Sequence, residues 1–110
     1  AARRDWITRM RQCLQSFDVM ISPTVPIVAP ELAPLVADDD KFFAVNAQLL
    51  RNPSVVNLLD GCALSLPCHA SGDLPVGLMV WQHELADEAV LAAALAIEQA
   101  IALSHRPAVR

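Results

Sequence analysis

Hydroxyl, thiol and imidazole side chains occur at two places in the sequence where they could take part in catalysis. Ser22-Pro23-Thr24 follows an apolar run, and a hydroxyl at the end of a strand could contact a ligand. Turns commonly use serine and threonine hydroxyls for local hydrogen bonds, so we expect a turn here. Cys68 precedes His69 and offers a thiol beside a base. Because neighbouring residues of an extended chain point to opposite faces, we expect no hydrogen bond between these two side chains.

Acidic and basic residues suggest two further kinds of site, a cation site and a catalytic amine. Asp38-Asp39-Asp40 could ligate a hard cation, but the glycine turn and spaced oxygen ligands of a calcium loop do not follow, which favours a solvated acidic loop. Lys41 is the only lysine and directly follows these aspartates, so we expect a surface side chain. Cys62, Cys68 and His69 lack the spacing of zinc ligands. The sequence therefore indicates no metal and no cofactor.

Composition narrows the class of protein. The 110 residues are 55% hydrophobic, which excludes intrinsic disorder, and the net charge of −4 offers no basic footprint for nucleic acid. Prolines interrupt the first apolar region, and no uncharged run reaches the length of about 18–20 residues that a membrane span needs. Three cysteines cannot all pair within one chain, which is typical of a reducing compartment. We therefore expect a cytoplasmic protein that binds neither nucleic acid nor a membrane.

Hydrophobic periodicity predicts seven elements in the order helix, strand, helix, helix, strand, strand, helix. Their ranges are 1–17, 18–22, 41–52, 53–59, 62–66, 76–81 and 86–103. Four prolines make residues 23–40 an irregular segment. Asn52 and Pro53 are typical of an N-cap and a first-turn proline, so they separate the second helix from the third. The fold class is α/β, with helices packed on a short mixed β-sheet.

The two later strands indicate that the three predicted strands are part of a wider sheet. Both are nearly continuous apolar runs, as expected of strands covered on both faces. Gly77 within the last strand predicts a bulge or a close backbone approach. A three-stranded sheet leaves unpaired edges, so we expect residues 1–110 to form a single but incomplete unit that self-associates through exposed apolar surface.

A set of motifs resembles the C-terminal end of the amidase signature family, which includes amidases and the A subunit of glutamyl-tRNA amidotransferase. The resemblance runs from about residue 5 to 103 and rests on the order and spacing of the motifs. They are Phe17–Thr24 with Pro26 and Ala29-Pro30 after it, Asn57–Pro67, Leu74–Val80, and an alanine-rich helix that opens at Asp87 and carries Glu98.

The resemblance implies a larger α/β/α fold and hydrolysis of carboxamides. In that family a serine is the nucleophile, a second serine bridges it to a lysine base, and backbone amides form the oxyanion hole. The Gly- and Ser-rich nucleophile segment of the family lies upstream of the matching region, and Ser22, Ser65 and Lys41 do not match its catalytic residues. The chain is thus expected to be an inactive scaffold part of a longer enzyme that acts on a small amide substrate.

The resemblance also implies which residues line the substrate funnel. The proline-rich segment after Thr24 and residues 50–57 are the candidates, with Arg51 and Asn57 as substrate-binding residues. For Asn57 the alternative is a buried amide that ties loop backbone together. Cys62 and Asp60 depart from the family pattern in a way that favours a simple amidase. The A subunit of a tRNA-dependent amidotransferase and a non-catalytic binding or assembly module remain alternatives.

Overall fold

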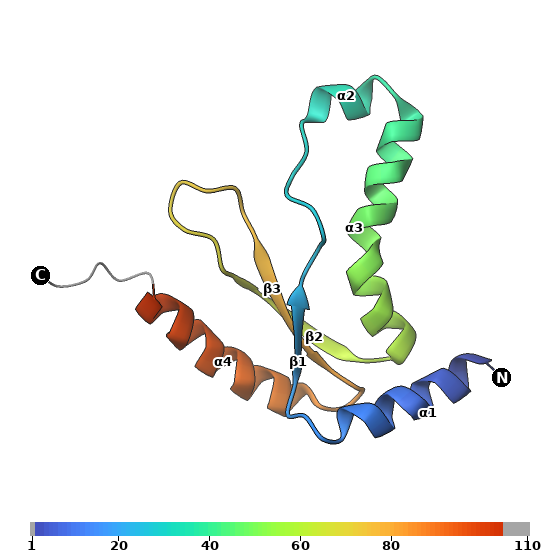
Figure 1. Cartoon of the computed structure of the whole chain (residues 1–110), viewed down its shortest axis with the longest axis vertical. Helices are drawn as coiled ribbons and strands as arrows, with labels where there is room; N and C mark the ends of the chain where they lie inside the picture. The colour runs from blue at the N-terminus through green and yellow to red at the C-terminus, as the bar shows by residue number, and fades with distance from the viewer. Residues whose placement is uncertain (1, 105–110) are drawn as a thin grey trace, which may run out of the picture.

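The computed structural model describes residues 2–104 and contains a three-stranded sheet with helices on both faces (Figure 1). The elements follow the expected order, and the α/β fold class is confirmed. They are α1 (Ala2–Leu14), β1 (Met20–Pro23), α2 (Leu32–Val36), α3 (Asp39–Leu59), β2 (Cys62–Pro67), β3 (Gly77–Gln82) and α4 (Asp87–Ser104).

The sheet has the order β1-β3-β2, and both pairings are antiparallel, where we expected a mixed sheet. The reason is the connection between β2 and β3. Residues 68–76 connect the end of β2 to the start of β3 by a short loop, so β3 runs back alongside β2 in the opposite direction. Parallel neighbours would need a longer crossover connection. β1 and β2 both run opposite to β3, so they are parallel to each other but separated by the central strand.

The central strand β3 is covered on both faces, as its apolar sequence predicts. Met79 and Trp81 face α1 and α3, whereas Val80 faces α4. Buried residues therefore form two clusters on opposite sides of the sheet. One contains Leu14, Val56, Leu59, Met79 and Trp81, and the other contains Leu66, Val80, Val90 and Ala94. This arrangement makes three layers, helix on sheet on helix.

Helix α3 is one continuous helix of 21 residues, so the predicted boundary at Asn52-Pro53 is wrong. Pro53 lies inside the helix, where it lacks an N–H to donate to the preceding turn. The helix continues because Val56 and Leu59, beyond the proline, are buried against the sheet, and because the Asn52 side chain bonds elsewhere instead of capping. The helix ends at Asp60, whose backbone is left-handed with φ 56°.

The segment 23–40 is less irregular than predicted. It contains the short helix α2 and the first residues of α3. Pro34 lies in the first turn of α2, where a missing N–H costs little. Asp38 caps α3, because its carboxylate accepts a hydrogen bond from the Lys41 backbone N–H at 3.2 Å. A helix N-cap at Asp38 thus replaces the loop that we expected for the acidic run, while Asp39 and Asp40 are exposed in the first turn of α3.

The molecule is a thin plate rather than a sphere. Its extents are 50 × 42 × 16 Å and its radius of gyration is 17.0 Å, whereas about 13 Å is usual for a chain of this length. The accessible surface is 8130 Å², and a compact monomer of 11.9 kDa would expose about 5,900 Å². Large apolar side chains form part of this exposed surface, among them Leu32, Val36 and Leu85.

Candidate functional site

Two hydroxyl groups meet across the central strand. Thr24 Oγ1, just after β1, lies 2.5 Å from Ser65 Oγ on β2, so the pair spans β3 at Gly77. A Cβ on Gly77 would lie 2.6 Å from Ser65 Oγ and 2.7 Å from Thr24 Oγ1, which leaves room for glycine alone. The close backbone approach predicted at Gly77 is confirmed. The local turn expected for the Thr24 hydroxyl is wrong, because its partner is 41 residues away.

Helix α3 is tied to the same end of β1. Asn52 Nδ2 donates a hydrogen bond to the Pro23 carbonyl oxygen at 2.8 Å. Beside this bond lies a hollow of about 230 Å³ between the helix and the sheet. It is lined by Ser22, Pro23, Asn52, Val55, Met79 and Trp81. None of these side chains carries a charge, so the hollow suits a neutral and mainly apolar group.

The indole of Trp81 is part of this hollow and has an unsatisfied donor. The side chain is buried, and its Nε1–H has no hydrogen-bond partner among residues 2–104. A buried donor without an acceptor is unfavourable by about 1–3 kcal/mol. An acceptor from outside the described residues would therefore stabilise the protein at this point.

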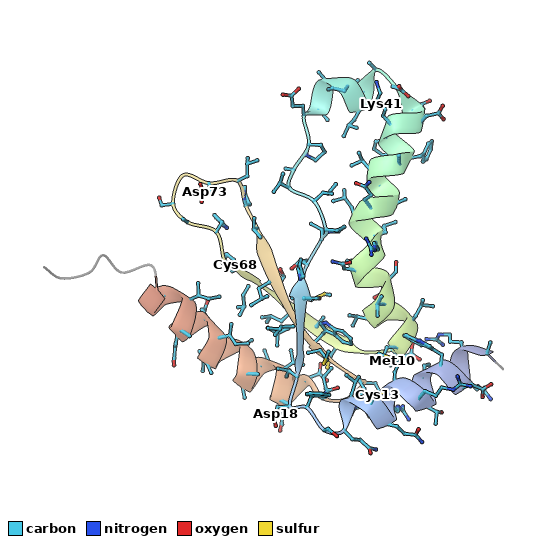
Figure 2. The ribbon with its side chains drawn as sticks, viewed as in Figure 1. Met10, Cys13, Asp18, Lys41, Cys68 and Asp73 are labelled. Atoms are coloured by element: carbon cyan, nitrogen blue, oxygen red, sulfur yellow. The ribbon has the colours of Figure 1, made fainter. Side chains whose placement is uncertain are left out.

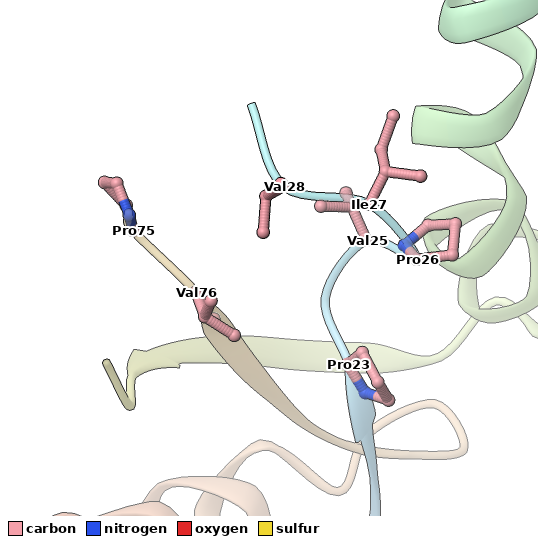
Figure 3. Close-up of a pocket in the computed structure, with 8 residues that line it drawn as sticks. Pro23, Val25, Pro26, Ile27, Val28, Pro75 and Val76 are labelled. Atoms are coloured by element: carbon pink, nitrogen blue, oxygen red, sulfur yellow. The ribbon is translucent and has the colours of Figure 1, made fainter. Parts of the chain in front are cut away.

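A second hollow, of about 240 Å³, opens between the proline-rich segment and the start of β3 (Figure 3). The Thr24 backbone N–H donates to the Gly77 carbonyl oxygen at 2.9 Å and holds the two walls together at their base. Its lining is almost entirely apolar and consists of Pro23, Val25, Pro26, Ile27, Val28, Pro75, Val76 and Gly77. The hydroxyl pair and both hollows thus gather around the end of β1.

The two substrate-binding candidates both lie on α3, but not on one face. Arg51 and Asn57 are exposed and are about 120° apart around the helix axis. The alternative of a buried amide at Asn57 is wrong, since its side chain is exposed and only its backbone carbonyl bonds the Asp60 N–H, at 3.2 Å. Asn52, which we expected only as an N-cap, is the α3 side chain that bonds to the end of β1.

The thiol and imidazole at Cys68 and His69 do not form a catalytic pair. The Cys68 thiol donates a hydrogen bond to the Val76 carbonyl oxygen at 3.5 Å. His69 Nδ1 accepts a hydrogen bond from the Val76 backbone N–H at 3.3 Å. Both side chains therefore close the loop before β3. This outcome matches the expectation that they do not reach each other.

The only lysine is far from the hydroxyl pair. Lys41 Nζ lies 3.3 Å from an Asp38 carboxylate oxygen at the start of α3, away from the sheet (Figure 2). Lys41 precedes Asn52 by eleven residues, which corresponds to about 16 Å along a helix. Within residues 2–104, the hydrogen bonds of Thr24 and Ser65 include no lysine or histidine side chain. The hydroxyls therefore lack a base.

Residues 2–104 bring no three metal-ligating side chains together. In this range, no helix combines the length and the apolar character that crossing a membrane requires.

Comparison with known proteins identifies the family. The family model described as Amidase matches residues 1–91. The chain belongs to the amidase family. The resemblance seen in the sequence motifs is thereby confirmed.

Named relatives show the breadth of the family. The A subunit of glutamyl-tRNA(Gln) amidotransferase from Salinispora arenicola is 35% identical over 105 residues, which is 96% of this chain and 20% of that protein. The protein of the same name from Sulfurisphaera tokodaii is 33% identical over 82% of this chain and 18% of its own. The 2-amino-5-chloromuconic acid deaminase of Comamonas testosteroni is 33% identical over 80% of this chain and 19% of its own.

The chain thus spans about a fifth of the length of the curated relatives it matches. No solved structure matches it.

Proposed function

We propose that this chain is the C-terminal scaffold part of an amidase-type hydrolase that cleaves carboxamide C–N bonds. The observation that carries the proposal is the separation of Lys41 from the Thr24–Ser65 hydroxyl pair in a member of the amidase family. Residues 2–104 bring hydroxyls and apolar walls together, but in this range no lysine or histidine side chain bonds the Thr24–Ser65 pair. The proposal assigns the reacting groups to polypeptide outside residues 1–110, upstream of them.

The chemistry would follow a Ser-Ser-Lys mechanism. A serine oxygen attacks the carboxamide carbon while its proton passes through a second serine to a neutral lysine. The C–N bond breaks, and the leaving amine takes up a proton. Water then hydrolyses the acyl-enzyme ester to the carboxylic acid and restores the serine. Fixed backbone amides stabilise the oxyanion in both steps.

The role of this chain would be to shape the substrate funnel. The hollow at the proline-rich segment and the hollow at Asn52 both have mainly apolar, uncharged walls, which suits the body of a small neutral amide. Arg51 and Asn57 are exposed on α3 and stay the proposed substrate-binding residues, but neither lines the two hollows, so they would contact a substrate outside them. The buried Trp81 N–H would receive its acceptor from the remaining polypeptide.

The proposal is tested by activity and by the neighbouring gene sequence. The 110-residue chain incubated with acetamide, benzamide and phenylacetamide should release no ammonia above the buffer control. Measurable release would show that the chain holds its own catalytic residues. The coding sequence upstream should specify a Gly- and Ser-rich run and a lysine. If it specifies neither, the chain would be better described as a non-catalytic binding or assembly module.

A second candidate is the A subunit of a tRNA-dependent amidotransferase. It is favoured by relatives that carry this name. The parent polypeptide would then co-purify with partner subunits, whereas a simple amidase would not need them. Cys62 and Asp60, which depart from the family pattern, favour the simple amidase.

We also propose a cytoplasmic location. All three cysteines are free in the structure, as expected where thiols stay reduced. Mass spectrometry of the chain from cell extracts, alkylated without a reducing agent, should find all three modified.

A further inference from the structure

The hollow between α3 and the sheet contains a buried donor without a partner. We call it the Trp81 hollow, and its lining consists of Ser22, Pro23, Asn52, Val55, Met79 and Trp81. Trp81 is 8% exposed, and its Nε1–H meets no acceptor among residues 2–104. A buried donor of this kind needs an acceptor from elsewhere, because it has given up its bond to water without a replacement.

Two further groups in the Trp81 hollow can pair with an incoming molecule. Asn52 donates from Nδ2 to the Pro23 carbonyl oxygen at 2.8 Å, and no described residue donates to its Oδ1. The Ser22 hydroxyl also bonds no described residue. The hollow therefore presents a donor on Trp81, an acceptor on Asn52 and a hydroxyl that can act as either.

Size and charge restrict what can enter the Trp81 hollow. It holds about 230 Å³, whereas a single water molecule needs only about 10–15 Å³. A group much larger than water therefore fits. No lining side chain is charged, so an ion buried here would lose its hydration without gaining a counter-charge. Val55 and Met79 add apolar wall, which suits a neutral group with an apolar substituent.

An amide group matches these partners. Its C=O can accept from Trp81 Nε1–H while its N–H donates to Asn52 Oδ1, so that both unpaired atoms gain a hydrogen bond. A ketone or an ester carries no N–H and would leave Asn52 Oδ1 unpaired. Backbone amides and small carboxamides share this chemistry.

We propose that the Trp81 hollow binds a backbone amide of the polypeptide that lies outside residues 1–110 in the parent enzyme. An apolar side chain next to that amide fills the rest of the hollow. The inference rests on the proposed function, in which this chain is a scaffold part that spans about a fifth of the length of the curated relatives it matches. It specifies a contact that attaches the remaining polypeptide to this scaffold.

Burial of the donor favours polypeptide over a small amide. Trp81 packs with Leu14, Val56 and Leu59 on the face of the sheet that α1 and α3 cover, and its N–H is itself covered. A molecule that binds and leaves has no open path to a covered donor. A segment that folds together with the sheet reaches the donor while the hollow is being formed.

The experiment compares the Trp81 indole proton in the 110-residue chain and in the full-length polypeptide that its gene encodes. Nuclear magnetic resonance of protein with isotope-labelled tryptophan observes this proton, and Trp81→Phe assigns it by removing its signal. In the full-length protein the signal should lie downfield of its position in the chain, and its exchange with deuterated water should be slower by about tenfold or more. The matched control is Trp6, which packs against the same cluster from α1 and should shift less. A Trp81 signal at the same position in both proteins would overturn the proposal.

A stability measurement gives an independent readout. Trp81→Phe keeps an aromatic ring but removes the donor. In the chain alone, the loss of an unpaired donor offsets the smaller ring, so the urea midpoint should shift little. In the full-length protein the same substitution breaks a hydrogen bond, so the midpoint should fall. Trp6→Phe should act in the same direction in both proteins. An equal fall for Trp81→Phe in both would contradict the proposal.

Added benzamide distinguishes the two sources of the amide. In the full-length protein the Trp81 indole signal should not move as benzamide is added, because the backbone already occupies the hollow. A saturable shift would assign the hollow to a small amide and overturn the docking of polypeptide. These outcomes are separable from the hydrolase proposal. Where the gene encodes the Gly- and Ser-rich run and the lysine, an unchanged indole signal rejects the docking alone.

Discussion

Asn52 on α3 and Pro23 at the end of β1 are joined by a hydrogen bond of 2.8 Å, from the side-chain amide to the backbone carbonyl. The bond lies one residue before the proline inside α3 and one residue before Thr24, whose hydroxyl pairs with Ser65. A helix, a strand end and a cross-strand hydroxyl pair are thereby held at one place. This place is where both hollows open.

Removing the amide donor should loosen α3 from the sheet. Asn52→Ala is expected to lower the free energy of unfolding by about 0.5–1.5 kcal/mol, the usual loss for one hydrogen bond. Urea denaturation followed by circular dichroism measures the change. Asn46→Ala, also on an exposed part of α3, is the matched control and should change stability by less than about 0.5 kcal/mol. Equal losses would mean that the bond contributes little.

Adding a methyl group at Gly77 should force the hydroxyl pair apart. Gly77→Ala is expected to destabilise the fold by about 1–3 kcal/mol, since the new Cβ would overlap both hydroxyl oxygens. Adding Ser65→Ala removes one of the two clashing atoms, so the Gly77→Ala substitution should cost less in that background. A double-mutant cycle in urea measures this coupling. Strictly additive effects would contradict the close approach.

Replacing the proline inside α3 should stabilise the protein. Pro53→Ala restores a backbone donor and relieves the clash with the preceding turn, and we expect a gain of about 1–3 kcal/mol. Pro34→Ala, in the first turn of α2, changes the same residue type where the missing donor matters little. Its effect on the thermal midpoint should be small. A loss of stability in Pro53→Ala would show that the proline has a role that the helix geometry does not explain.

The cap at Asp38 should support the start of α3. Asp38→Ala removes the acceptor for the Lys41 N–H and should cost about 0.5–2 kcal/mol, whereas Asp38→Asn keeps an oxygen in place and should cost much less. Asp40→Ala lies in the first turn of the same helix and serves as the control for charge. Amide hydrogen exchange at residues 41–45 reports whether the first turns fray. Equal protection in all variants would argue against the cap.

The sequence and the structure disagree at particular residues for identifiable reasons. Asn52 and Pro53 have the local signature of a helix start, but burial of Val56 and Leu59 against the sheet holds them in the middle of one helix. The Thr24 hydroxyl has the signature of a local turn, but the strand order brings Ser65 closer than any turn partner. In both cases a contact between residues far apart in sequence overrides a local preference.

The three strands, the first and last helices, the burial of β3 on both faces and the family all follow from the sequence, because hydrophobic periodicity and motif spacing are properties of contiguous residues. The sequence also indicated the special position of Gly77. The antiparallel pairing, the helix α2, the continuity of α3 and the Thr24–Ser65 contact became visible in the folded chain. These features depend on pairing energies between segments that are distant in the chain, and no local pattern encodes them.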